Sequence, residues 1–334
     1  MSARVTHKRI LGGTLIQTIF LFKNCSTVTA SSSFSYPVIV KGKGASVIKK
    51  WLIVGGDRRQ LAAARYLCGQ GITVETWGLD ENPIETDWKN AVKDADILLL
   101  PLPVTTDGVR IQCPLIKSDG IRFTSLLETV RQDALVFGGK IPALWEEQAK
   151  QVDVWLCDYY FSESLQMKNA LPTVEGAIML AMQALPVTLD GCSVAILGYG
   201  RIASLLAERL VALGADVTVF ARKERDLAHA VLRHCKAIEL KGVDADSSLC
   251  HLPEQCRIVF NTVPERIVSK KVLEFWRRDC VLMELASFPG GFDTLSAEKM
   301  GFHLILAQGL PGKLFPETAG TIIAQTVLDL VHNS

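Results

Sequence analysis

No charge of one sign dominates this sequence, and no apolar run is long enough to cross a membrane. The chain of 334 residues has 36 Lys and Arg against 35 Asp and Glu, a net charge of +1. Binding of nucleic acid over a broad face needs a basic patch or stripe, which this balance argues against. A membrane-spanning helix needs about 20 consecutive apolar residues. We therefore expect no nucleic acid and no membrane among the partners of this protein.

Cysteine and histidine patterns typical of metal sites are also absent. The nine cysteines form no Cys-x-x-Cys pair, and no His-Glu-x-x-His occurs. We predict no metal site and interpret the cysteines as free thiols in a reducing compartment. What the sequence does have is a hydrophobic content of 49%, enough for well-buried cores, and a length typical of two domains.

The first 49 residues differ from the rest of the chain. Basic residues between Arg4 and Arg9 precede an apolar stretch at residues 10–22, and small residues follow. That order is the outline of a secretory signal. The serines and the Lys-Gly repeat that come next are typical of a flexible linker. We interpret residues 1–49 as a flexible N-terminal extension of a cytoplasmic protein; secretion is the alternative.

Short apolar runs alternate with segments of helical spacing between residues 50 and 170. The runs occupy residues 51–54, 73–77, 97–100, 134–137 and 154–157. This alternation predicts a doubly wound parallel sheet. In such sheets ligands bind beyond the carboxyl ends of the strands, where this sequence has Arg58, Arg59 and Lys140. Arginine forks suit carboxylates, so these residues are candidates for binding a substrate anion; ordinary turns with solvated charges are the alternative.

Residues 171–314 contain Gly-x-Gly-x-x-Ala between an apolar run and a helical segment. The run at residues 192–197 leads into Gly198, Gly200 and Ala203. In a Rossmann-like dinucleotide site these small residues permit the tight turn, the approach of the pyrophosphate and close helix packing. The pyrophosphate rests on the N-terminus of the helix. We expect the same site to include Tyr199, Arg201 and Ile202.

The end of the next apolar run, residues 216–220, bears on the choice between NAD and NADP. NAD sites normally carry an acidic residue there, for the ribose hydroxyl. This chain has Arg222 and Lys223 instead. Two cations favour a 2′-phosphate, so we predict NADP as the cofactor; a solvated loop is the alternative.

Three later runs, at residues 258–260, 281–285 and 303–306, end in loops that we expect to line the nicotinamide half of this site. The cofactor contacts expected from these loops are Thr262, Val263, Pro264, Ala286, Ser287, Gly309 and Leu310. Ser287, Lys313 and Thr318 are also candidates for contact with the substrate, and each could equally be a helix cap or a surface residue.

Two further helices complete the predicted architecture. One opens at Pro172, runs through Ala184 and links the two domains. The other, within residues 315–334, opens at Thr318 and packs back on the first domain. The predicted fold class is α/β, with two Rossmann-like doubly wound parallel-sheet domains, residues 50–170 and 171–314, joined by a linking helix.

Nine motifs occur in an order that resembles one known family. They are Gly-Gly-Asp-Arg-Arg at 55–59, Phe-Gly-Gly-Lys at 137–140, Pro-Thr-Val-Glu-Gly-Ala at 172–177, Gly-Tyr-Gly-Arg at 198–201, Phe-Ala-Arg at 220–222, Asn-Thr-Val-Pro at 261–264, Leu-Ala-Ser with Pro-Gly-Gly at 285–291, Gly-Leu-Pro-Gly at 309–312 and Thr-Ala-Gly at 318–320. Together they are similar to the motifs of the dipicolinate synthase A-subunit family. Phe288 and Glu317 depart from that family's pattern, which has cations at both positions.

The resemblance implies an NADP-dependent dehydrogenase that oxidises dihydrodipicolinate, a small dicarboxylate, to dipicolinate during sporulation, in the mother-cell cytoplasm. It also implies a flavoprotein-like partner, the dipicolinate synthase B-subunit, and we expect a homo-oligomer. The catalytic candidates are Lys140, Glu175 and Ser287. The candidates for binding the substrate are Arg58, Arg59, Lys140, Lys313 and Thr318. We expect Glu175 in the first turn of a helix, where it is either a proton acceptor with a lowered pKa or a carboxylate that only favours the helix dipole.

Two other functions stay open at this point. The chain could be a non-catalytic NADP-binding subunit of a two-component enzyme. It could also be a related two-domain NADP-dependent dehydrogenase with another carboxylate substrate, which predicts a catalytic His with a supporting carboxylate. Of the six His residues only His303 lies in the strand region of the second domain, and it lies within a strand rather than at its carboxyl end.

Overall fold

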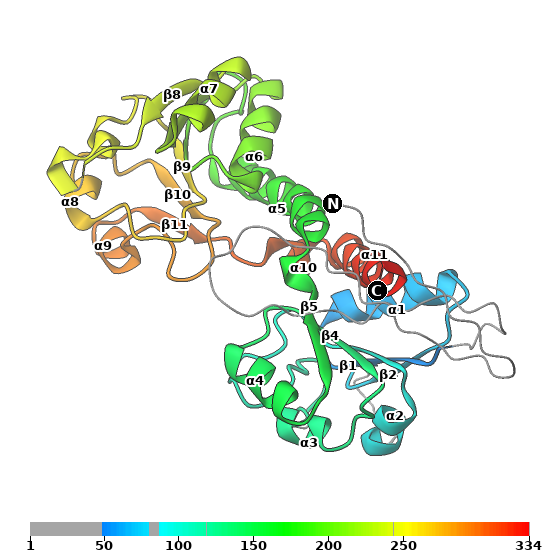
Figure 1. Cartoon of the computed structure of the whole chain (residues 1–334). Helices are drawn as coiled ribbons and strands as arrows, with labels where there is room; N and C mark the ends of the chain where they lie inside the picture. The colour runs from blue at the N-terminus through cyan, green and yellow to red at the C-terminus, as the bar shows by residue number, and fades with distance from the viewer. Residues whose placement is uncertain (1–48, 80–86, 118, 243, 334) are drawn as a thin grey trace, which may run out of the picture.

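Two parallel β-sheets with their helices make up the part of the chain that the computed structural model describes, residues 49–79, 87–117, 119–242 and 244–333. Figure 1 shows them as two lobes joined by the long helix α5 (Glu163–Ala184). The predicted fold class is confirmed. The secretory signal and the flexible extension expected at the N-terminus lie outside the described residues.

The first sheet has the strand order β2-β1-β3-β4-β5. Its parallel strands are β1 (Trp51–Val54), β2 (Val74–Trp77), β3 (Ile97–Leu99), β4 (Leu135–Gly138) and β5 (Trp155–Asp158). The helices of this lobe are α1 (Arg58–Gly69), α2 (Trp88–Asp94), α3 (Phe123–Leu127) and α4 (Ala143–Gln151). The central strands β1, β3 and β4 are buried along their whole length, which explains their continuous apolar runs.

The second sheet has the order β11-β10-β9-β6-β7-β8, that of a doubly wound dinucleotide-binding sheet. Its parallel strands are β6 (Ser193–Leu197), β7 (Asp216–Ala221), β8 (Lys236–Glu239), β9 (Ile258–Asn261), β10 (Val281–Glu284) and β11 (His303–Leu306). The α-helices of this lobe are α6 (Arg201–Ala212), α7 (Glu224–Leu232), α8 (Lys270–Leu273) and α9 (Thr294–Lys299). Strand β8 is not among the predicted apolar runs, because it is a half-exposed edge strand with few apolar residues.

The linking helix α5 begins at Glu163, so the predicted start at Pro172 is wrong. The side chain of Ser162 accepts a hydrogen bond from the N–H of Leu165 and caps the true start. Proline is common in the first turn of a helix, where its missing N–H costs nothing. Here Pro172 lies inside the helix, and the expected boundary between residues 170 and 171 falls within the same helix.

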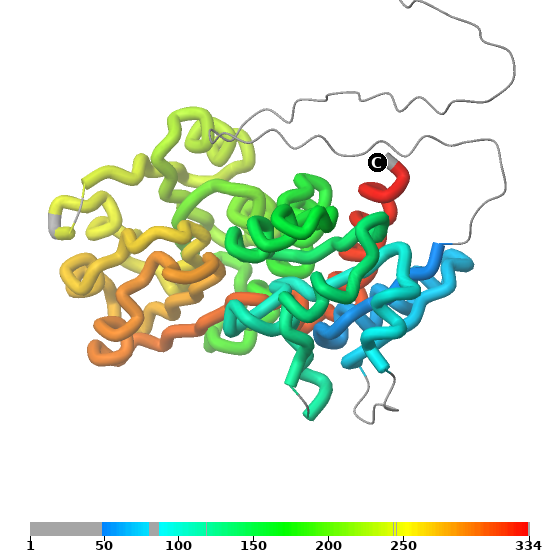
Figure 2. Tube along the Cα trace, turned by 60° about the horizontal axis from the view of Figure 1, so that its bottom comes forward, coloured from blue at the N-terminus to red at the C-terminus, as the bar shows by residue number. Residues whose placement is uncertain are grey.

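The chain returns to the first lobe through α10 (Leu310–Leu314) and α11 (Pro316–Asn333). Figure 2 shows α11, in red, beside the blue first lobe. The core of that lobe includes apolar side chains from α11, namely Ile322, Ile323, Ala324 and Val327. The predicted return is confirmed, although the helix starts two residues before Thr318, at Pro316. Among the described residues no helix is both long and apolar enough to cross a membrane.

Candidate functional site

The turn after β6 is built as the glycine pattern predicts. Gly198 has φ +94°, a conformation that favours glycine. A Cβ at Gly198 would lie only 2.6 Å from Oγ1 of Thr262. That hydroxyl donates a hydrogen bond of 2.8 Å to the carbonyl of Leu197. Thr262 therefore supports the turn by closing it against the end of β6.

The N-terminus of α6 is open at Gly200. No side chain caps the helix, and a Cβ at Gly200 would meet no heavy atom of the described residues within 4 Å. The first backbone N–H groups of a helix have no partner within it, and the helix dipole favours negative charge there. Ala203 is fully buried, which lets α6 pack closely on the sheet. The turn can thus hold an anion such as a pyrophosphate.

Two of the predicted cofactor residues turn their side chains away from this opening. Tyr199 and Ile202 pack against the core of the second lobe. The Tyr199 hydroxyl is buried without a hydrogen-bond partner among the described residues, and burial raises its pKa. The turn can therefore use the backbone of these two residues, but not the Tyr199 hydroxyl, to contact a ligand.

Arg201 joins the opening to the linking helix. Its Nε donates a 2.8 Å hydrogen bond to Oε1 of Glu163, the first residue of α5. This pairing raises the pKa of Arg201 and lowers the pKa of Glu163. Both side chains are about half exposed or more, so the pair contributes little to stability. Its effect is to fix the guanidinium beside the N-terminus of α6.

Arg222, expected to bind the 2′-phosphate, is already paired. Its Nη2 lies 2.8 Å from Oε2 of Glu265, on the loop after β9. The pair borders a cavity of about 350 Å³ beyond the ends of β7 and β8. Lys223 is exposed at the N-cap of α7. A phosphate at this position would have to compete with the Glu265 carboxylate for Arg222.

A buried carboxylate that is not among the predicted site residues holds the loop after β10. Glu284 is 1% exposed. Its Oε1 accepts hydrogen bonds from Nδ2 of Asn261 and the N–H of Ala286, at 2.6 and 3.0 Å. Its Oε2 accepts from the N–H groups of Gly291 and Phe292, at 2.7 and 3.3 Å. These four bonds fix the path of residues 285–292.

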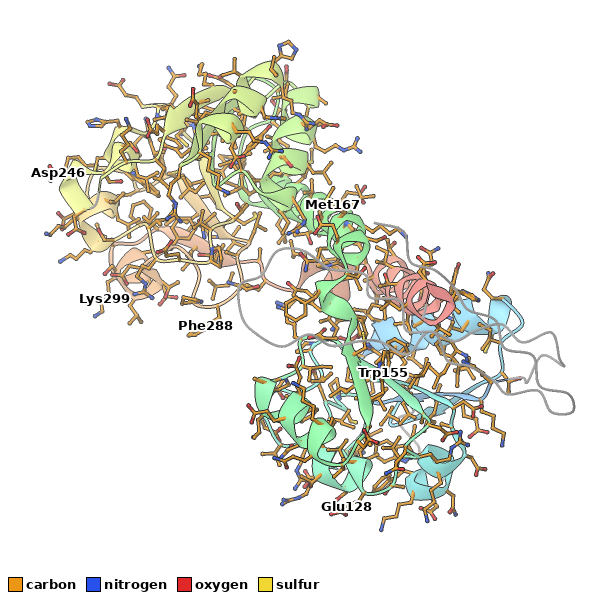
Figure 3. All side chains as sticks on the ribbon, viewed as in Figure 1. Glu128, Trp155, Met167, Asp246, Phe288 and Lys299 are labelled. Atoms are coloured by element: carbon orange, nitrogen blue, oxygen red, sulfur yellow. The ribbon has the colours of Figure 1, made fainter. Side chains whose placement is uncertain are left out.

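The remaining loop candidates differ in exposure. Ser287, Pro264 and Gly309 are exposed, whereas Ala286 and Leu310 are buried. Phe288 is 94% exposed and projects from the side of the second lobe that faces the first (Figure 3). The rigid loop that Glu284 holds therefore presents an apolar ring, and not a cation, toward the first lobe.

In the first lobe, Arg58 and Arg59 have different environments. Arg58 is exposed at the start of α1. Nε of Arg59 lies 2.9 Å from Oδ1 of Asp57, and Nη2 lies 2.8 Å from Oδ2. The same Nη2 also donates to the carbonyl of Leu102. A substrate carboxylate could therefore meet Arg59 only through Nη1.

Lys140 stands on a turn that Asp158 holds in place. The Asp158 carboxylate accepts hydrogen bonds from the N–H groups of Lys140, Ile141 and Tyr160, at 3.1, 2.7 and 2.8 Å. Burial raises the pKa of Asp158, against the opposing effect of these bonds. Lys140 has φ +56°, and its Nζ lies 4.8 Å from the centre of the Tyr160 ring. The exposed ammonium group is thus fixed at the carboxyl edge of β4.

The junction of the lobes brings three of the sequence motifs together. A Cβ at Gly312 of α10 would lie 2.9 Å from Nε of Arg59, and one at Gly176 of α5 would lie 3.0 Å from Leu314. Lys313 therefore comes directly after Gly312, which lies against Arg59. Glu175 comes directly before Gly176, which lies against Leu314 of α10. Glu175 is exposed in the middle of α5, so its predicted position in a first turn is wrong. Thr318 is exposed near the start of α11.

Comparison with known proteins identifies the family. Residues 50–160 match the family described as the N-terminal domain of the dipicolinate synthase A-subunit. The chain is 32% identical to the dipicolinate synthase A-subunit of Bacillus subtilis over 294 residues, covering 84% of this chain and 95% of that protein. The crystal structure of the A-subunit from Bacillus halodurans superposes with a TM-score of 0.76 at 28% identity, covering 86% of this chain and 98% of the other.

Two further solved structures separate the family from the fold. The crystal structure of the dipicolinate synthase A-subunit from Bacillus subtilis gives a TM-score of 0.73 at 30% identity, over 86% of this chain and 96% of the other. D-lactate dehydrogenase from Escherichia coli gives 0.53 at 10% identity, over 84% and 96%, and so shares only the fold. The extent and identity of the dipicolinate synthase matches decide the assignment: the chain belongs to the dipicolinate synthase A-subunit family.

Proposed function

We propose that this protein oxidises dihydrodipicolinate to dipicolinate with NADP⁺ as the hydride acceptor. The observation that carries the proposal is the uncapped N-terminus of α6, where Gly200 leaves open space in front of free backbone N–H groups. It lies in a sheet with the strand order of dinucleotide-binding proteins. The proposed substrate is inferred from membership of the dipicolinate synthase A-subunit family.

In this proposal NADP binds to the second lobe. The pyrophosphate would rest on the N–H groups that follow Gly200, with Arg201 beside it. Arg222 and Lys223 would hold the 2′-phosphate, once Glu265 has yielded Arg222. The loops at residues 262–264, 286–287 and 309–310 would border the nicotinamide. When bound, NADP⁺ supplies the acceptor for the hydride; the protein supplies position and electrostatics.

The first lobe would hold the two substrate carboxylates. Lys140 is fixed and exposed, Arg58 is exposed, and Arg59 retains Nη1. Lys313 and Thr318, which are exposed on the returning chain, would complete this site. Aromatisation drives the reaction, so the orientation of the ring C–H supplies most of the acceleration.

Besides the hydride the substrate loses one proton. Glu175 or water is the acceptor for that proton, with Ser287 as a polar contact. Glu175 lies outside a first turn, which removes the helix-dipole argument against it as a base. Its exposed carboxylate on α5 therefore stays a candidate.

The setting that we propose is the cytoplasm of the mother cell in a sporulating bacterium. The active enzyme would be a homo-oligomer of this chain acting with the flavoprotein-like B-subunit of dipicolinate synthase. A catalytic histidine is disfavoured, because His303 begins β11 and so lies at the amino edge of the sheet, opposite the candidate site.

The deciding experiment follows the ultraviolet absorbance of dipicolinate, formed from enzymatically generated dihydrodipicolinate and NADP⁺. The chain is assayed by itself and together with the B-subunit. We expect NADP⁺-dependent product from the chain by itself. Product only when the B-subunit is present would support the second candidate, a non-catalytic NADP-binding component. No product in either assay, with NADP⁺ binding intact, would refute the substrate.

A further inference from the structure

Three buried cysteines lie in a row at the edge of the second sheet opposite the candidate site. Cys192, Cys256 and Cys280 stand at or just before the amino ends of β6, β9 and β10, and β9 lies between the other two strands. Their exposures are 5%, 3% and 1%. No part of the proposed dehydrogenase reaction uses this edge of the sheet.

Cys256 and Cys280 form a close pair within this row. Both side chains line the same cavity, and each shifts the pKa of the other. The Sγ of Cys256 donates to the carbonyl of Ile258 at 3.4 Å, and the Sγ of Cys280 donates to the carbonyl of Val281 at 3.8 Å. The backbone around them is held by the pairing of β9 with β10, in which Ile258 is the partner of Val281. The N–H of Val281 also donates a 2.8 Å bond to the carbonyl of Arg257. The two thiols therefore lie on neighbouring segments whose separation is fixed by the sheet.

A cavity of about 530 Å³ opens beside the pair and gives small molecules a route to it. Its volume lies in the range of small-molecule pockets. The residues that line it are Cys250, His251, Leu252, Pro253, Glu254, Cys256, Phe275, Trp276, Arg277 and Cys280. Both Cys256 and Cys280 are free cysteines.

We propose that Cys256 and Cys280 form a modification site, which a small disulfide compound entering this cavity oxidises to an intramolecular disulfide. The Cys256 thiolate attacks one sulfur of the reagent RSSR, which forms a mixed disulfide and releases one thiolate. The sulfur of Cys280, losing its proton to that thiolate, then attacks the sulfur of Cys256 and releases the second thiolate, which takes up the proton that Cys256 gave up on ionising. The protein loses two protons and two electrons, and RSSR gains them as two RSH.

The order of attack follows from the pairing. The neighbouring Cys280 side chain lowers the pKa of Cys256, whereas the Cys256 side chain and burial raise the pKa of Cys280. Cys256 is therefore the first nucleophile. Cys250 also lines the cavity, but it lies in the 3₁₀ helix Ser248–His251 and not beside the start of a strand, and burial raises its pKa. Cys250 is therefore the control.

The test treats the folded full-length chain with oxidised glutathione, alkylates the remaining thiols after denaturation and maps the peptides by mass spectrometry. We expect alkylation to be lost at Cys256 and Cys280 together, with one peptide that links them, and to return after dithiothreitol. Cys68, which is exposed, reports by its mixed disulfide that the reagent was active. Cys250→Ser should leave the linked peptide unchanged, and Cys280→Ala should convert it to a glutathione adduct on Cys256.

Two results would overturn the proposal. One is full alkylation of both cysteines in the native chain while Cys68 carries glutathione. The other is a link from Cys256 to Cys250 or Cys192 instead of Cys280. Both are read on the unmodified sequence, so they do not depend on the folding of a variant.

Discussion

The side-chain amide of Asn261 donates a 2.6 Å hydrogen bond to the carboxylate of Glu284 in the interior of the second lobe. The two residues are register partners at the ends of β9 and β10, and neither is more than 1% exposed. A buried acidic side chain needs full hydrogen bonding to offset its lost hydration. Here that bonding is directed at the backbone of the following loop, so one side chain decides where residues 285–292 lie.

Glu284→Gln should loosen this loop. An amide at position 284 places one of its own N–H groups against a donor, either Asn261 or the N–H of Gly291, and leaves it unpaired. We expect the free energy of unfolding to fall by about 2 kcal/mol, the cost of an unsatisfied buried group. Urea denaturation measures the loss, and hydrogen exchange of Gly291 and Phe292 locates it. The exposed control, Glu298→Gln on α9, should change neither; equal effects of both variants would contradict the assignment.

Gly200→Ala should weaken the binding of NADP⁺ without destabilising the fold, whereas Gly198→Ala should destabilise the fold. The methyl group at position 200 enters open space at φ −83°, so the free energy of unfolding should change by less than about 1 kcal/mol. It occupies the place of the pyrophosphate, so NADP⁺ affinity should fall at least about tenfold, or about 1.4 kcal/mol. Gly198→Ala, at φ +94° and 2.6 Å from Thr262, should instead destabilise the fold itself. Calorimetric titration and urea denaturation give the two readings. Unchanged NADP⁺ binding by a folded Gly200→Ala protein would show that the pyrophosphate does not bind at this turn.

Arg222→Glu should change the cofactor preference. A charge-assisted bond to phosphate is worth about 1.5–3 kcal/mol, so NADP⁺ binding should weaken about 10- to 100-fold while NAD⁺ binding is little changed. Arg209→Glu, at the far end of α6, is the matched control for net charge. Glu265→Gln should act in the opposite sense, because it frees Arg222. If Arg222→Glu leaves the ratio of the two affinities unaltered, Arg222 does not bind the 2′-phosphate.

Lys140→Met should weaken substrate binding without harm to the fold. It removes the exposed ammonium and keeps an unbranched side chain that reaches to the ε position, so the KM for dihydrodipicolinate should rise about tenfold or more. The Asp158 bonds go to backbone N–H groups and survive the change. Lys89→Met on α2 serves as the control. A KM equal to that of the unmodified protein would mean that other cations bind the substrate carboxylates.

Asp96 should make stability depend on pH in the acid range. Burial raises the pKa of Asp96, but the N–H of Lys50 and the guanidinium of Arg131, at 2.8 and 2.7 Å, outweigh it and hold the pKa below its ordinary value of 3.8. A depressed pKa in the folded state gives stability that is present above pH 3.8 and is lost as pH falls through the lower value. Denaturation at several pH values should show Asp96→Asn less stable than the unmodified protein near neutrality, with the difference shrinking in acid. A constant difference would exclude the carboxylate as the cause.

The elements with strong local signals were predictable from the sequence. The buried strands of both sheets are apolar runs because parallel strands are covered on both faces, and β1, β4 and β6 end at glycine turns. The start of α5 was not predictable in this way, since Pro172 is a residue typical of a first turn and the Ser162 cap gives a weaker signal. Because of that error Glu175 was expected in the first turn of a helix, whereas it lies in the middle of α5.

The candidate site was predictable only in outline. Spacing predicted the turn at Gly198 and Gly200 and made Arg222 a candidate, but the pairings of these and other side chains leave no mark in the sequence. Glu265 meets Arg222 across two strand ends, and Asp57 pairs with Arg59 through the rotamer of one side chain. Glu284 did carry a usable signal, a single acidic residue at the end of an apolar run, followed by the glycine pair Gly290 and Gly291, and it indicates a buried carboxylate bonded to backbone.

The return of α11 to the first lobe has a consequence for synthesis on the ribosome. Ile322, Ile323, Ala324 and Val327 belong to the same core as strands β1 and β3, although most of the chain separates them. A domain cannot complete its core until every segment of that core has left the exit tunnel. Residues 193–306 emerge as a complete sheet earlier, so the domain that begins first during translation is the one that finishes last.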